Sequence, residues 1–144
     1  NHEYQRGAQL SPSFDGSGNP IPGSGVSIGK SQIAGAARIT GTAGATLDLA
    51  KTSAGIITLQ LDGAYTSRIY YDVLNTRSSS SGPRWVQNGR IALEGRNFTF
   101  ALFSKNIFGK KYFAYSTNLQ DGFGYIQFVR GAPRTIGGEV PLKF

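Results

Sequence analysis

The sequence of 144 residues contains no cysteine and no methionine, and its one histidine is His2. Without cysteine, disulfide bonds and thiolate metal sites are excluded. His2 has no second histidine or carboxylate at ligand spacing, so we interpret it as a solvent-exposed residue and expect no metal and no cofactor. A Ser-His-Asp set and paired carboxylates are also missing, and we therefore expect no catalytic residues and no enzymatic activity.

Long hydrophobic runs are missing as well. No segment approaches the roughly 20 consecutive apolar residues of a membrane-spanning helix, and glycine or a β-branched residue interrupts every candidate helix. The sequence instead has 20 glycines and 12% aromatic residues, a mixture that favours strands and turns. The length suits one ordinary domain, so the sequence predicts a single all-β domain.

Acidic residues are few, with 8 Asp and Glu against 15 Lys and Arg, which gives a net charge of +7. Such an excess indicates an anionic partner, whether nucleic acid, lipid A phosphates or an acidic ligand. The basic residues are scattered along the chain, which argues against nucleic acid as a partner. A soluble basic β-domain that binds nucleic acid or polysaccharide remains an alternative, and it predicts binding that weakens steeply with salt.

The stretch from residue 131 to residue 144, GAPRTIGGEVPLKF, alternates with a period of two. Counting back from Phe144 in steps of two, the residues are apolar or glycine, and those between them are mostly polar. This pattern predicts a strand over 132–144 with two unlike faces. Pro141 cannot donate a ladder hydrogen bond, so we expect an edge-like or bulged position there.

Four further stretches alternate and exceed the five or six residues of a usual strand. The alternation over 84–95 is weaker, and Phe103 is the one exception to it over 97–108. About 9–11 residues suffice for a tilted strand to cross a bilayer. The fold class predicted is therefore all-β, an antiparallel up-and-down meander of about five long strands that forms part of a transmembrane-type β-barrel. The predicted strands lie near 33–50, 56–72, 84–95, 97–108 and 132–144.

The predicted connections alternate between long and short. Outer-membrane barrels show the same asymmetry, with short periplasmic turns and long extracellular loops. The aromatic residues Tyr65, Tyr70, Tyr71 and Trp85 lie beside long connections, where an aromatic girdle is expected. This reading places Phe144 on the periplasmic side, and it allows YIQFV within the last connection to pair as a strand extension. The connections are long at 1–32, short at 51–55, long at 73–83, short at 94–97 and long at 109–131.

Two motifs carry a resemblance to a known family. SKNIFGKKYF, residues 104–113, and GAPRTIGGEVPLKF, residues 131–144, resemble the C-terminal end of TonB-dependent outer-membrane receptors. The first contains Asn106 and continues to Tyr112, with Gly109 where the family usually has an acidic residue. The second opens with Gly131, Ala132, Pro133 and Arg134. The clear resemblance covers residues 56–144, and the region before it matches in pattern only.

The resemblance implies import of a siderophore, cobalamin or a similar nutrient across the bacterial outer membrane, powered through TonB. Family members have about 22 strands around a plugged lumen, whereas this sequence supplies about five and has no plug domain or TonB box. It begins at Asn1 without an initiating methionine, so we expect a mature or excised piece that is not competent for transport alone.

The expected partners follow from the missing strands. They are the remaining strands of the parent receptor or further copies of this chain, together with outer-membrane lipid and lipopolysaccharide. TonB is expected to act only through the missing N-terminal parts. The alternative reading is a structural fragment whose open edges pair into an oligomeric barrel, fibre or tube, which would be extracellular if the fragment is released.

Candidate site residues fall into two groups. Ligand contacts are expected in the outer loops, although each candidate is also explained as an interface aromatic or a cation that faces lipopolysaccharide: Arg77, Trp85, Lys110, Lys111, Tyr112, Tyr115 and Arg130. Arg134 is expected to anchor the corner between loop and last strand through charge-assisted hydrogen bonds. The residues expected to act in structure and assembly are Asn106, Gly131, Pro133, Arg134, Ile136, Val140, Leu142 and Phe144.

Overall fold

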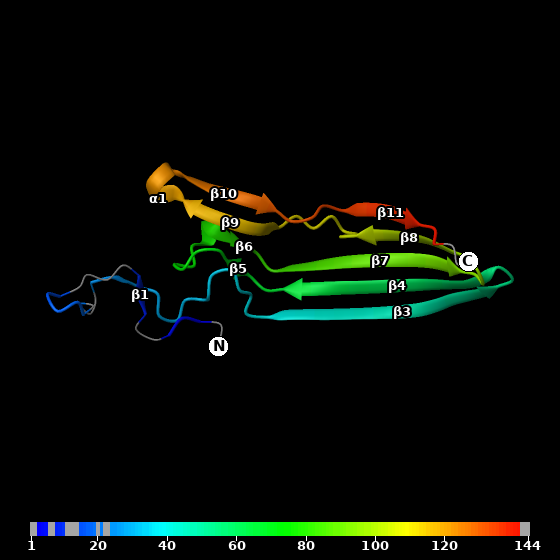
Figure 1. The fold of residues 1–144 in the computed structure, drawn as a ribbon, viewed down its shortest axis with the longest axis horizontal. Coiled ribbons are helices and arrows are strands. Elements are labelled where there is room, and N and C mark those ends of the chain that lie inside the picture. The colour runs from blue at the N-terminus through cyan, green and yellow to red at the C-terminus, as the bar shows by residue number, and fades with distance from the viewer. Residues whose placement is uncertain (1–2, 6–7, 11–14, 20, 22–23, 142–144) are drawn as a thin grey trace. The chain divides into compact units, whose positions relative to one another are not determined.

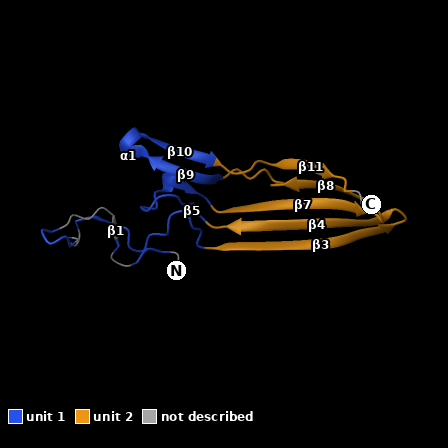
Figure 2. Ribbon diagram, in the orientation of Figure 1, with its two compact units in different colours: residues 1–38, 68–82, 113–129 blue, residues 39–67, 83–112, 130–144 orange. Residues whose placement is uncertain are grey.

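The computed structural model describes residues 3–5, 8–10, 15–19, 21 and 24–141. The expectations for His2, Leu142 and Phe144 lie outside the described residues. The chain divides into two compact units, shown in separate colours in Figure 2. Unit 1 comprises residues 1–38, 68–82 and 113–129, and unit 2 comprises residues 39–67, 83–112 and 130–144.

Unit 2 is one antiparallel sheet of five strands. In Figure 1 these strands lie side by side in the order of the chain, so each pairs with the next one along. Among the described residues, the two outermost strands each have one partner strand and the sheet is not closed. The predicted all-β antiparallel meander of five strands is confirmed. The strands are β3 (Thr40–Thr52), β4 (Gly55–Thr66), β7 (Arg84–Glu94), β8 (Thr99–Lys105) and β11 (Thr135–Glu139).

The register sorts the side chains of unit 2 onto an apolar face and a polar face. Leu47 pairs with Leu59, which pairs with Ile91, and Ile91 pairs with Leu102. One position along, Gln60 pairs with Arg90 on the opposite face, because successive side chains of a strand point to opposite sides. The pattern of two unlike faces that the sequence shows is therefore maintained across the sheet.

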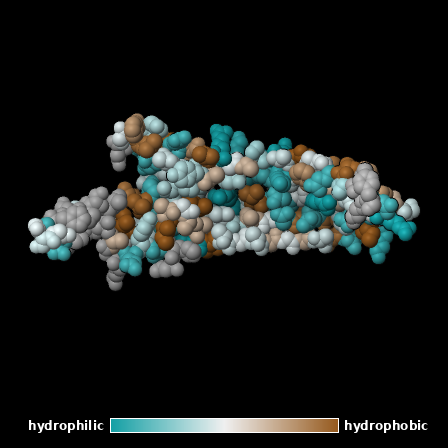
Figure 3. Space-filling model, viewed as in Figure 1, coloured by the Kyte–Doolittle hydropathy of each residue, from teal (hydrophilic) through white to brown (hydrophobic). Residues whose placement is uncertain are grey.

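Neither face of this sheet is buried within the chain. All 13 positions of β3 are exposed, and Ala92 and Ala101 are the only buried hydrophobic residues of unit 2 among those described. On the apolar face, Leu102 and Ile136 are 64% and 70% exposed. Figure 3 shows hydrophilic side chains gathered over the middle of this sheet, with hydrophobic ones between them. An apolar surface of this kind implies contact with lipid or with further protein.

Phe103 is the one large apolar side chain of β8 on the polar face, and it lies against β11. It pairs with Gly137, and a Cβ added to Gly137 would lie 2.5 Å from the ring of Phe103. The Lys105 ammonium lies 5.8 Å from the centre of the same ring. The glycine thus lets the ring lie flat across the edge strand, which explains why Phe103 interrupts the alternation.

The strand bounds differ from the predicted ones at both ends of the sheet. Residues 33–39 were expected to open the first long strand but form turns, with Gly35 at φ 77°. The side-chain amide of Gln32 donates to the carbonyl oxygens of Ala36 and Arg68 and so keeps both segments out of the ladder. At the other end, the ladder of β11 stops at Glu139, and the Pro141 carbonyl accepts a hydrogen bond of 3.1 Å from the Thr99 amide.

Unit 1 consists largely of short antiparallel pairs, where the sequence predicted long connections with pairing allowed only for YIQFV. The YIQFV segment does lie in a strand, β10 (Tyr125–Arg130). The connection 109–131 contains a hairpin, in which β9 pairs with β10 across the single helical turn α1 (Gln120–Phe123). No helix in the described part of the chain is long and apolar enough to cross a membrane. The remaining elements are β1 (Gln9–Leu10), β2 (Val26–Ser27), β5 (Ile69–Tyr70), η1 (Arg77–Ser79), β6 (Ser80–Ser81), β9 (Phe113–Leu119) and β10 (Tyr125–Arg130).

Candidate functional site

Asn106 follows β8 in unit 2 and holds together two segments that are distant in sequence. It is 3% exposed and has φ 50°, a left-handed conformation that asparagine tolerates better than most residues. Its Oδ1 accepts from the Lys110 amide at 2.8 Å, and its Nδ2 donates to the carbonyl oxygens of Lys110 and Ala132 at 3.0 Å each. One side chain thereby closes the turn 106–110 and binds the segment that leads into β11.

Tyr112 and Gly131 complete this arrangement. The Gly131 amide donates to the Tyr112 carbonyl at 2.9 Å, and a Cβ on Gly131 would lie 2.1 Å from the Tyr112 ring. The guanidinium carbon of Arg84 lies 4.5 Å from the centre of that ring, a cation–π distance. We call the cluster of Asn106, Lys110, Tyr112, Gly131 and Ala132 the Asn106 corner. The two motifs that carry the family resemblance meet in it.

A chain of hydrogen bonds joins the Asn106 corner to the polar face of the sheet. The Asn106 amide donates to Asn88 Oδ1 at 3.0 Å, and Asn88 Nδ2 donates to Asp62 Oδ2 at 2.6 Å. The side chains of β4 and β7 are thus connected to the turn after β8 and to the segment before β11.

The other residues expected to act in assembly lie beyond the corner. Pro133 and Arg134 are exposed between it and β11, and the described residues supply no ion pair or side-chain hydrogen bond to Arg134. The anchoring role of Arg134 stays a prediction. Ile136 and Val140 are 70% and 58% exposed, as expected for side chains that await a partner.

The predicted ligand residues are divided between the two units. Arg77 and Tyr115 belong to unit 1, where Tyr115 packs edge-on against Tyr71 with ring centres 5.9 Å apart. Trp85 lies on the apolar face of unit 2, 48% exposed, with its ring centre 5.4 Å from that of Tyr65. The residues of this set that belong to unit 2 are Trp85, Lys110, Lys111, Tyr112 and Arg130. Their role as ligand contacts stays a prediction.

Sequence reasoning did not single out the charged cluster on the polar face. Arg90 lies 3.9 Å from a carboxylate oxygen of Glu94 and 3.6 Å from one of Glu139, and Thr58 Oγ1 donates to Glu94 at 3.4 Å. These residues come from three strands, so only the strand register could have brought them together. The pairs are partly exposed, and such ion pairs are individually weak.

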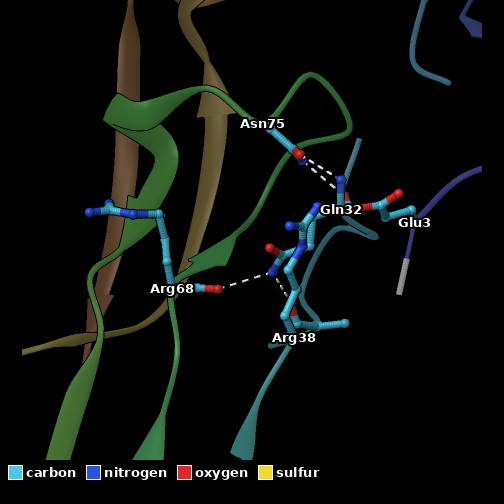
Figure 4. Close-up of polar contacts among 6 residues, drawn as sticks. Glu3, Gln32, Arg38, Arg68 and Asn75 are labelled. Atoms are coloured by element: carbon cyan, nitrogen blue, oxygen red, sulfur yellow. Dashed lines mark hydrogen bonds and ion pairs between the residues drawn. The ribbon is translucent and has the colours of Figure 1, made fainter. Parts of the chain in front are cut away.

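Unit 1 has a polar network of its own, shown in Figure 4. The buried Gln32 receives and donates backbone hydrogen bonds with the Asn75 side chain, at 2.9 and 2.6 Å, and its side chain donates to the Arg68 carbonyl at 3.0 Å. Arg38 forms an ion pair with Glu3. Each hydrogen bond of Gln32 has a backbone group of this unit as donor or acceptor, so we assign the network to structure. Across the described residues, no group of three or more acidic or histidine side chains could hold a metal ion.

The chain is similar to known proteins in its fold and not in its sequence. No protein-family model matches the chain, and no curated protein matches it in sequence. The ferric yersiniabactin uptake receptor FyuA of Yersinia pestis superimposes with a TM-score of 0.60 at 15% identity, over 73% of this chain and 16% of that one. The chain has the fold of a siderophore-receptor segment. The predicted resemblance to TonB-dependent receptors is confirmed at the level of the fold.

A second receptor of this kind gives the same result. The ferric preacinetobactin receptor BauA of Acinetobacter baumannii has a TM-score of 0.54 at 18% identity, over 76% of this chain and 15% of that one. The chain therefore spans about a sixth of the length of either receptor, and the likeness at these identities concerns the fold alone.

Proposed function

We propose that the chain is the C-terminal barrel portion of a TonB-dependent outer-membrane receptor that imports a siderophore, cobalamin or a similar nutrient. The observation that carries the proposal is the five-stranded meander with one apolar and one polar face, whose fold is that of segments of two ferric-siderophore receptors. In such a barrel the apolar face contacts lipid and the polar face lines the lumen. The role is that of a transport scaffold, without enzymatic activity.

The partners proposed are the remaining strands of the parent receptor, outer-membrane lipid and lipopolysaccharide, with TonB acting through the N-terminal parts of the receptor. Since the chain spans about a sixth of either similar receptor, we propose that it does not transport alone. An open sheet is disfavoured in lipid because each unsatisfied backbone group costs several kcal/mol there.

Paramagnetic accessibility of the two faces tests the proposal. The chain contains no cysteine, so single cysteines can be placed in the 144-residue chain refolded with lipid vesicles and labelled with a nitroxide. We expect labels at Leu61 and Ile91 to be accessible to oxygen, and labels at Gln60 and Arg90 to be accessible to a water-soluble nickel chelate. Equal exposure of both pairs to the nickel chelate would overturn the outer-membrane reading.

A second function is favoured by the open edges of the sheet. β3 and β11 each have one partner strand among the described residues, and β3 is exposed throughout. Edges of this kind recruit further strands, so copies of the chain could close an oligomeric barrel or extend a fibre or tube. Sedimentation and negative-stain imaging test this reading, and a purely monomeric chain would remove it.

A further inference from the structure

The apolar face of unit 2 contains two furrows that meet at Trp85. The first has a volume of about 670 Å³ and the second about 490 Å³, both within the roughly 300–1,000 Å³ of small-molecule sites. They share Trp85, Gln87 and Phe108 and so form one continuous depression.

The first furrow is a mainly apolar channel. Its bed is low because Ala43, Ala45 and Gly63 carry little or no side chain. Its large apolar lining residues include Leu61 of β4 and Ile107 and Phe108 of the turn after β8. Among its polar lining residues, Gln87 shares the apolar face, whereas Asp62 and Asn88 bond each other at 2.6 Å on the polar face of the sheet. The channel suits a flexible hydrocarbon chain.

The second furrow, by contrast, is cationic. Arg84 and Lys110 are among its lining residues, and no acidic residue is among those described there. Lys111 follows Lys110 directly and is exposed. The Tyr65 and Trp85 rings lie at this end, and paired aromatic residues of this kind prefer the headgroup level of a bilayer.

The two furrows therefore match the two ends of one molecule. We propose that they bind a membrane lipid with an anionic phosphate headgroup, its phosphate at Lys110 and one acyl chain in the channel past Trp85. From Trp85 to Asn88 along β7 the lining of the channel extends roughly 10 Å at the usual strand rise. The site rests on the proposed function, since it requires the apolar face to be in contact with a bilayer.

The only tryptophan of the sequence lies where the furrows meet, so its fluorescence reports on the site. The 144-residue chain is refolded with two kinds of phosphatidylcholine vesicle. One contains a small fraction of phosphatidylglycerol brominated near the headgroup, and the other contains the same fraction of phosphatidylcholine brominated near the headgroup. We expect brominated phosphatidylglycerol to quench Trp85 as if it were enriched about fivefold over brominated phosphatidylcholine. This is the enrichment expected from the attraction between one basic residue and an anionic lipid.

Two pairs of variants identify the site. Lys110→Gln is expected to reduce the preference towards unity, whereas Lys105→Gln, on the polar face, leaves it unchanged. Ala43→Leu fills the channel and lowers quenching by both brominated lipids, whereas Ala50→Leu, on the same face of β3 but outside the furrow lining, does not. The lipid site would be overturned if both brominated lipids quenched Trp85 equally and neither Lys110→Gln nor Ala43→Leu changed that quenching.

A second reporter separates failure of the site from failure of the proposed function. Leu47 lies on the same face of β3 outside the furrows, and Leu47→Trp combined with Trp85→Phe moves the tryptophan there. Quenching at position 47 without quenching at Trp85 shows that protein covers the furrows, whether a second copy or another strand, and overturns the lipid site alone. Absence of quenching at both positions overturns the membrane location itself.

Discussion

Asn106 combines a buried side chain, a left-handed backbone and three side-chain hydrogen bonds. The sequence pointed to this residue through the family resemblance, but its role could not be derived, because its partner Ala132 lies 26 positions along the chain. A resemblance indicates that a residue matters, whereas the hydrogen-bond partners indicate why.

Asn106→Ala is expected to lower the free energy of unfolding by about 1–3 kcal/mol, because it leaves one partly buried donor and two acceptors without their partner. The measurement is denaturant unfolding of the lipid-refolded chain. Asn118→Ala is a suitable control, since Asn118 Oδ1 accepts one exposed hydrogen bond from the Gln120 amide at 3.1 Å. Equal stability of the two variants would contradict the role of Asn106.

Gly131→Ala tests the contact between Gly131 and the Tyr112 ring. The added Cβ would lie 2.1 Å from the ring, so the ring must leave its place under Arg84, at a cost of about 1–3 kcal/mol. Gly41→Ala is the control, because no atom lies within 4 Å of a Cβ at Gly41. In the background Tyr112→Ala the cost of Gly131→Ala is expected to fall markedly, and a cost that stays the same would refute the contact.

Some strands of this fold could be predicted from the alternation of the sequence, and others could not. The bounds of β4, β7 and β8 were predicted to within a few residues at one end or at both ends. Their two faces meet different surroundings, so their sequences alternate between apolar and polar residues. Residues 33–39 alternate too, yet the contact of Gln32 with Arg68, 36 positions away, takes them out of the sheet. The sequence of this segment does not indicate that it leaves the sheet, because its alanine and glycine residues fit a turn as well as a strand.

Phe103→Ala is expected to loosen β11, the edge strand against which the ring packs. Cross-strand pairs contribute roughly 0.2–1 kcal/mol, so amide exchange over residues 135–139 should accelerate by about fivefold at the upper limit. Phe98→Ala is the control, since Phe98 packs against Phe100 and Gly95 and not against β11. Equal acceleration in both variants would mean that the whole sheet, and not β11, depends on aromatic packing.

The sheet of unit 2 has two open faces that differ in polarity, and substitutions on each face distinguish a membrane barrel from a soluble β-domain. Ala45 and Thr46 are adjacent, both exposed, and belong to opposite faces of β3. In an outer-membrane barrel Ala45→Lys places a charge in the hydrocarbon at a cost of about 2–4 kcal/mol near the midplane, whereas Thr46→Lys places it in the lumen at little cost. Recovery of folded, protease-resistant chain from lipid vesicles should therefore fall for Ala45→Lys and stay near the unmodified level for Thr46→Lys. A soluble β-domain would tolerate both substitutions equally, because both side chains would then face water.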